Sequence, residues 1–112
     1  PPEALSHNPA IINEYAIDPL VFKKATARWV VETVDNQAAA LNRAGDIKLP
    51  LLVAQGMADS IASAGAAKEF FDRAGSPDKE WIPYEGLYHE VLNENEREDV
   101  YQAILKWLEA RI

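Results

Sequence analysis

The chain has 112 residues, of which 48% are hydrophobic and 26% are charged, a balance typical of one small folded domain or of part of a larger one. Its formal net charge of −7 argues against a nucleic-acid partner, because no basic stripe is present to neutralise phosphates. The absence of cysteine excludes disulfides and thiolate metal sites, and no apolar run approaches the roughly 20 residues of a transmembrane segment, so we expect a cytoplasmic location with at most peripheral membrane contact.

The N-terminal third is predicted to be loop and helix. His7 is expected on the surface, and a short helical turn is expected from Pro9 to Tyr15. Asp18-Pro19-Leu20 is typical of a helix start, with an acidic N-cap and proline at the first helical position. The helix is predicted to continue to Val34, because apolar residues recur at helical spacing on one face. That stripe consists of Phe22, Ala25, Thr26, Trp29, Val30, Thr33 and Val34.

A second helical piece and then a strand are predicted next. The alanine-rich segment Asp35–Ala44 is expected to be helical, with Gly45 as its C-cap. Leu51–Ala54 is a continuous apolar run between Pro50 and Gly56, which is typical of a strand buried on both faces. This run therefore predicts an α/β fold, with helices on both faces of the sheet and a further strand beside it.

The remaining elements complete a strand–helix–strand unit. Ser63 is predicted to cap a helix that Gly75 ends, and Glu80–Tyr84 is predicted to be the second strand, with its proline favouring an edge position. A connection of this length indicates a right-handed parallel crossover. Arg97–Ile112 is the clearest helix of the chain, because its apolar residues fall on one face.

Two polar residues follow these two strands. Asp59 lies four residues after Gln55, and His89 lies five residues after Tyr84. Because parallel strands end at the same edge of a sheet, we expect the two side chains to come within hydrogen-bonding reach. Asp59 alone is also consistent with a helix cap or a turn, and His89 alone with an ordinary loop histidine. Together they indicate a general base oriented by a carboxylate, which fixes the imidazole tautomer and stabilises the imidazolium.

Three stretches carry a resemblance to a known family: Ile47–Asp59, Ser76–Glu80 and Tyr84–Glu94. In them the chain resembles the C-terminal part of serine hydrolases of the α/β-hydrolase fold, in particular the monoacylglycerol lipase and lysophospholipase group. The resemblance implies that Asp59 is the acid and His89 the base of a catalytic triad. Their order along the chain fits the Ser, Asp, His order of this fold.

The resemblance also implies a domain organisation and a substrate. Residues 1–45 would be the end of a cap or lid region with its connecting helices, and residues 46–112 would be the C-terminal half of the hydrolase core. The implied activity is hydrolysis of a carboxylic ester, such as a monoacylglycerol or a lysophospholipid, without a cofactor. Peptidases, thioesterases and epoxide hydrolases remain rivals, because the acid–histidine half is shared across the fold.

The nucleophile of such an enzyme is not found in these residues. No Gly-x-Ser-x-Gly motif occurs, and the serines at positions 6, 60, 63 and 76 have other surroundings. Ser60, next to Asp59, is interpreted as a loop serine. We therefore expect the nucleophile in an N-terminal half of the same hydrolase, and we expect this chain alone to be inactive and either to pair with that half or to self-associate. The alternative is a non-catalytic interaction module that retains half of the fold.

An acidic run lies around the start of the last predicted helix. Its spacing could indicate a divalent-cation site, but negative charge near a helix N-terminus is also favoured by the helix dipole. The dipole interpretation is preferred, and no metal is predicted. The run consists of Glu85, Glu90, Glu94, Glu96, Glu98 and Asp99.

Overall fold

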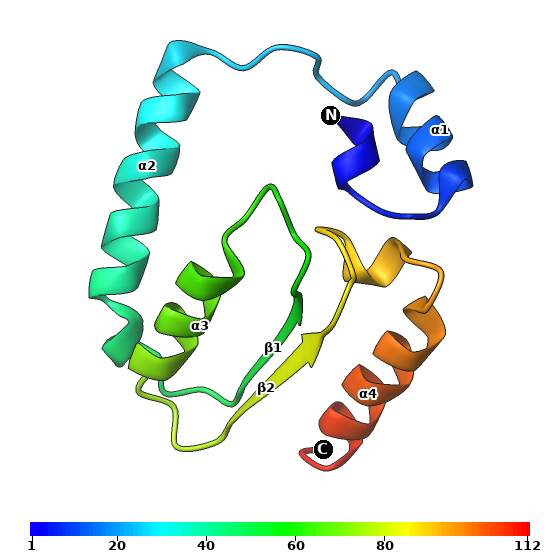
Figure 1. Cartoon of the computed structure of the whole chain (residues 1–112). Helices are drawn as coiled ribbons and strands as arrows, with labels where there is room; N and C mark the ends of the chain where they lie inside the picture. The colour runs from blue at the N-terminus through cyan, green and yellow to red at the C-terminus, as the bar shows by residue number, and fades with distance from the viewer.

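The computed structural model of the protein describes residues 1–112. Its two strands, β1 (Leu51–Gly56) and β2 (Lys79–Tyr84), lie side by side in a parallel sheet (Figure 1). Leu51 pairs with Lys79 at one end and Gly56 with Tyr84 at the other. The helix α3 (Ala64–Arg73) connects the two strands. The predicted strand–helix–strand unit is therefore confirmed, and it forms the centre of the chain.

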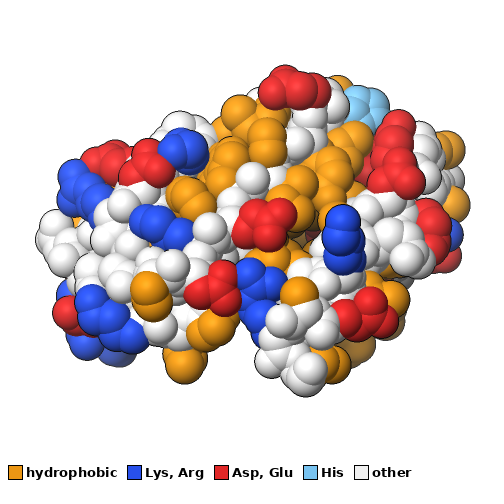
Figure 2. Space-filling model, turned by 90° about the horizontal axis from the view of Figure 1, so that it is seen from below, with side chains coloured by type: hydrophobic (Ala, Val, Ile, Leu, Met, Phe, Trp, Pro, Cys, Tyr) orange, Lys and Arg blue, Asp and Glu red, His pale blue; other side chains and the backbone are white.

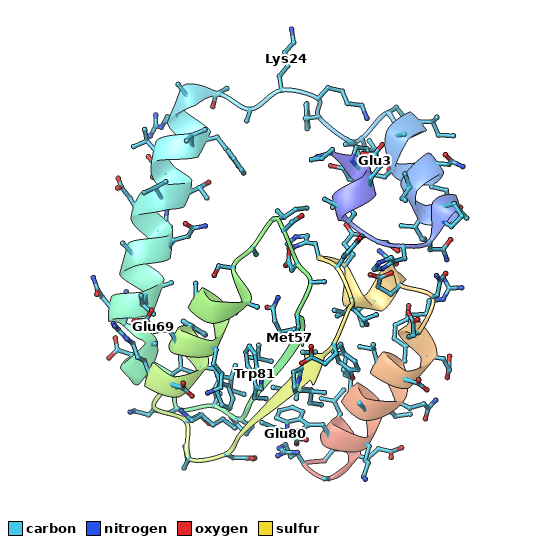
Figure 3. All side chains as sticks on the ribbon, viewed as in Figure 1. Glu3, Lys24, Met57, Glu69, Glu80 and Trp81 are labelled. Atoms are coloured by element: carbon cyan, nitrogen blue, oxygen red, sulfur yellow. The ribbon has the colours of Figure 1, made fainter.

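The two faces of this sheet are covered by different helices. On one face the Trp81 ring lies 5.6 Å from the Phe71 ring of α3, between the helix and the strands (Figure 3). On the other face Ala54 and Tyr84 pack against a buried cluster that includes Val100 of α4 (Arg97–Glu109). Successive side chains of a strand point to opposite faces, so an apolar strand needs cover on both. The expected helices on both faces are present.

The N-terminal segment is helical over a different range from the predicted one. The helix α1 (Pro9–Ile17) includes the predicted turn. The predicted helix start at Asp18 is wrong, because residues 18–26 form no helix. The Asp18 carboxylate accepts a hydrogen bond from the Leu20 N–H at 2.8 Å. This bond closes a local turn, and no helix follows it. Figure 3 shows Lys24 of this segment pointing away from the rest of the chain.

A single helix follows, where the sequence predicts two pieces. The helix α2 (Ala27–Asn42) begins after Thr26, whose hydroxyl accepts a hydrogen bond from the Trp29 N–H at 3.1 Å. It continues without a break at Asp35, since the alanines beyond that point have high helix propensity. Gly45 is not the predicted C-cap, because it lies inside the short 3₁₀ helix η2 (Ala44–Asp46) with negative φ.

Gly75 also has a different role from the predicted one. The helix α3 starts as predicted, with the Ser63 hydroxyl accepting a hydrogen bond from the Ala66 N–H at 3.2 Å. Its C-cap is Ala74, and Gly75 does not adopt the left-handed conformation of a glycine cap. Gly75 instead approaches the η2 backbone so closely that a Cβ atom would lie 2.2 Å from the Gly45 carbonyl oxygen. Glycine is needed here for space.

The chain has a small core and much exposed apolar surface. Only 10 of its 112 residues are buried, and large side chains such as Phe22, Trp29 and Val34 are exposed. Figure 2 shows apolar side chains gathered across the middle of one face, between charged groups on either side. No helix has the length and apolar character required to cross a membrane.

The Gly75 contact can be tested by substitution. We expect Gly75→Ala to lower the free energy of unfolding by about 1–3 kcal/mol, because the new methyl group meets backbone that must move. Gly65→Ala is the matched control, since a Cβ atom there meets only the Ser63 hydroxyl at 3.6 Å. That change should leave stability unchanged or raise it by up to about 1 kcal/mol. Urea unfolding of both variants measures the difference, and equal effects would contradict the assignment.

Candidate active site

Asp59 is held at the carboxyl edge of the sheet by the turn that follows β1. Its Oδ1 accepts hydrogen bonds from the N–H groups of Ile61 and Ala62 at 2.8 and 3.0 Å. The side chain is only 2% exposed. Asp59 therefore stabilises a turn through Oδ1, as one of the two interpretations of this residue predicts. Its other oxygen, Oδ2, has a different partner.

That partner is His89, in the loop after β2. The His89 Nδ1 lies 2.9 Å from the Asp59 Oδ2, and the imidazole is 38% exposed. The structure thus brings together the two side chains that the sequence predicts to meet across the parallel strands. Since an ionised carboxylate only accepts hydrogen bonds, Nδ1 carries the proton and Nε2 has its lone pair free in the neutral ring. This is the arrangement of a base oriented by an acid.

The loop that carries His89 is seated directly on the end of β1. The Ala58 N–H donates to the Leu87 carbonyl oxygen at 3.0 Å. A Cβ atom on Gly56 would lie 2.1 Å from the Tyr88 carbonyl oxygen, so only glycine permits this approach. Gly86 has φ of +81°, the one left-handed residue of the chain, and it turns the loop sharply after β2. These contacts fix the separation between the two loops.

The surroundings of Asp59 favour its ionised form. Burial alone would raise its pKa, but the hydrogen bonds from the Ala62 N–H, the His89 ring and the Ile61 N–H outweigh that effect. The pKa of the Asp59 carboxyl is held below its ordinary value of 3.8. Asp59 is therefore an anion at neutral pH, as the orientation of a histidine base requires.

A second histidine–carboxylate pair lies beside the first, and the sequence did not indicate it. The His7 Nδ1 lies 3.0 Å from the Glu94 Oε1, and the His7 ring stacks on the Tyr88 ring with centroids 3.7 Å apart. Although 42% of the His7 side chain is exposed, its role is not that of an ordinary surface residue. The two partners are 87 residues apart in the chain, so no local pattern could have revealed the pair.

Glu94 corrects the interpretation of the acidic run. Its side chain is fully buried, and it does not belong to the solvated charges around the start of α4. Burial would raise the pKa of the Glu94 carboxyl, but hydrogen bonds from the Tyr88 and His7 N–H groups and the His7 ring lower it on balance. No group of three His, Cys, Asp or Glu residues is arranged to hold a metal ion.

Three of the four serines have hydrogen-bond partners that give them a structural role. The Ser6 hydroxyl lies 2.8 Å from the Asn93 carbonyl oxygen, Ser63 caps α3, and the Ser76 hydroxyl donates to the Asp78 carbonyl oxygen at 2.8 Å. Ser60 is exposed in the turn next to Asp59. None of them follows a strand in the sharp strand–turn–helix elbow that an activated serine needs.

A parallel sheet with an acid and a histidine in the loops after its strands is characteristic of the α/β-hydrolase class. The chain belongs to the family described as "Serine aminopeptidase, S33", whose model matches residues 1–96. Two relatives of known name are similar over most of this chain. Phospholipase YtpA of Bacillus subtilis is 33% identical over 88% of the chain, and the monoacylglycerol lipase of Mycolicibacterium smegmatis is 29% identical over 95% of it.

Solved structures agree with this assignment. The Paleococcus ferrophilus monoacylglycerol lipase matches 96% of the chain with a TM-score of 0.90 and 31% identity. A soluble variant of the Saccharomyces cerevisiae monoglyceride lipase matches 99% of it with a TM-score of 0.86 and 19% identity, which supports the fold. The chain covers 42% of each of these two structures and 38% of each of the two named relatives. It therefore has part of an α/β-hydrolase fold.

The lowered pKa of Asp59 predicts a pH-dependent contribution to stability. A carboxyl whose folded pKa is depressed stabilises the fold above its unfolded pKa of about 3.9, and this contribution is lost as the pH falls through the folded value. We expect the difference in Tm between the native protein and Asp59→Asn to be largest above about pH 5 and to shrink at lower pH. Thermal unfolding from about pH 6 to pH 2.5 measures it, and a constant difference would contradict the expectation.

Proposed function

We propose that this chain supplies the acid and the base of a serine ester hydrolase, with Asp59 and His89 in those roles. The single observation that carries the proposal is the 2.9 Å contact between the His89 Nδ1 and the buried Asp59 carboxylate at the edge of the parallel sheet. Membership of a hydrolase family adds support. The nucleophilic serine and the oxyanion hole would come from residues outside this chain.

The chemistry follows from the orientation of the ring. With Nδ1 bound to Asp59, the Nε2 of His89 takes the proton of the serine hydroxyl as its oxygen attacks the ester carbonyl carbon. The imidazolium then donates this proton to the departing alcohol as the ester C–O bond breaks, which leaves an acyl-enzyme. Next, Nε2 deprotonates a water molecule that attacks the acyl carbon, and the proton returns to the serine when the carboxylic acid is released.

The substrate class is inferred from the relatives. A phospholipase and two monoacylglycerol lipases are among the proteins to which the chain is similar, and all three names denote cleavage of esters in lipids. We therefore infer a lipid ester with one acyl chain, such as a monoacylglycerol or a lysophospholipid. The family description names an aminopeptidase, so amide substrates are the rival to test.

The exposed apolar side chains of the N-terminal part, such as Phe22 and Trp29, are consistent with a cap region that packs against other parts of the enzyme. We propose that residues 1–45 are the end of the cap region and that residues 46–112 belong to the hydrolase core. Tyr15, Phe22 and Trp29 line an open groove between α1 and the start of α2, where another part of the enzyme would cover them. This cover would come from the N-terminal half of the same hydrolase.

The roles of the pair are tested by substitution in the intact enzyme. We expect His89→Ala to remove nearly all hydrolysis of p-nitrophenyl esters, because no neighbour can replace the base. Asp59→Asn should reduce kcat by about 10⁴-fold, as loss of the triad aspartate does in a serine protease, since it stabilises the wrong tautomer. Ser60→Ala is the control and should retain full activity. Wild-type turnover by His89→Ala, or loss of activity in Ser60→Ala, would overturn the assignment. An amide substrate cleaved faster than the matched ester would favour the peptidase.

The isolated 112 residues provide a second test. Because 10 buried residues give a small core and one side of β1 is unpaired, we expect this polypeptide to self-associate and to lack esterase activity. Size-exclusion chromatography with light scattering measures its mass. A single monomer peak with cooperative thermal unfolding would contradict the proposed organisation, and ester hydrolysis by that monomer would contradict the proposed mechanism.

A further inference from the structure

His89 is fixed through the backbone of both neighbouring residues. On one side the Tyr88 N–H donates to the Glu94 Oε1 at 2.7 Å, and on the other side the Glu90 N–H donates to the Leu5 carbonyl oxygen at 2.8 Å. The imidazole itself makes its side-chain hydrogen bond to Asp59. The position of the ring therefore depends on two anchors that do not touch it.

Of the two anchors, the Glu94 side chain has more hydrogen-bond partners. Its carboxylate is fully buried and is surrounded by hydrogen-bond donors from two segments far apart in the sequence. Oε1 accepts from the Tyr88 N–H at 2.7 Å and lies 3.0 Å from the His7 Nδ1. Oε2 accepts from the His7 N–H at 2.7 Å and lies 3.2 Å from the Ser6 hydroxyl. None of these bonds goes to the first N–H groups of α4, so helix capping does not account for them.

We propose that Glu94, together with His7, is a positioning residue that holds His89 in register with Asp59. The Glu94 carboxylate binds the backbone N–H of Tyr88, immediately before His89. The His7 ring stacks on the Tyr88 side chain and so holds the same residue. The Tyr88 carbonyl oxygen also lies close to Gly56, which limits movement of the loop toward the end of β1. This inference rests on the proposed function, because it assigns a catalytic consequence to the position of His89.

The chemistry of the site requires a carboxylate. A glutamine side chain has the same shape, but its NH₂ group would face an N–H donor at either oxygen position. Two donors facing each other in a buried site are unsatisfied, so the loop would move to separate them. A displacement of about 1 Å at a catalytic group can lower the rate by about 10²-fold. Ground-state substrate binding does not involve the base and should change little.

The test uses Glu94→Gln in the intact enzyme with a p-nitrophenyl ester. We expect kcat to fall by about 10²-fold with KM within about twofold of the native value, and the downfield proton NMR signal of the His89 Nδ1–H to shift or broaden. Glu96→Gln is the matched control: Glu96 is exposed two residues away, and it makes no capping hydrogen bond. It should leave kcat, KM and the proton signal unchanged.

The outcomes separate this inference from the proposed function. If His89→Ala is active, the proposed function fails and the inference fails with it. If His89→Ala is inactive but folded Glu94→Gln keeps the native kcat, or loses activity through KM alone with the proton signal unchanged, only the inference is overturned. If Glu94→Gln does not fold, His7→Ala decides, because 42% of the His7 side chain is exposed and we expect the protein to fold without it. At least a fivefold fall in its kcat supports the inference, and a native kcat overturns it.

Discussion

The parallel pairing of β1 and β2 is the constraint on which the rest of the chain depends. Two adjacent strands that run in the same direction end at the same edge, so the loops that follow them start only a strand spacing apart. An antiparallel pair would have placed Asp59 and His89 at opposite ends of the sheet. The helix α3 supplies the crossover that makes the parallel arrangement possible, and α4 covers the other face.

Strand pairing alone does not produce a hydrogen bond of 2.9 Å. The two loops are brought to their final separation by backbone contacts at the end of β1, where Gly56 lies against the Tyr88 carbonyl and Ala58 bonds to Leu87. Asp59 is held by a turn through one oxygen and holds His89 through the other. The same carboxylate is thus both a structural and a candidate catalytic group, so the two interpretations of this residue are compatible.

The N-terminal segment adds a link that is distant in the sequence. Leu5 and His7 contact the loop around His89, and Glu94 joins them with a buried carboxylate. In the proposed organisation this segment belongs to the end of the cap region. The proposed catalytic histidine, His89, would then contact the end of the cap region as well as the core.

The sequence by itself determined those parts of the protein whose cause is local. The apolar run of β1, the Ser63 cap of α3 and the spacing of Asp59 and His89 after their strands each follow from residues close together in the chain, and the structure has them as predicted. The helix start at Asp18 failed because a favourable cap closes a turn equally well, and continuation of a helix depends on what it packs against.

Only the tertiary structure decided the rest. Gly45 and Gly75 appeared to be helix caps, yet Gly45 lies inside η2, and Gly75 lies too close to the Gly45 carbonyl for a side chain. That close contact is a property of two segments brought together by folding. Glu94 resembled its acidic neighbours in the sequence, but four hydrogen-bond donors assembled from residues 6, 7 and 88 replace its hydration and make its burial possible. Local patterns specify which element forms, whereas burial and close contact depend on partners that the sequence places far away.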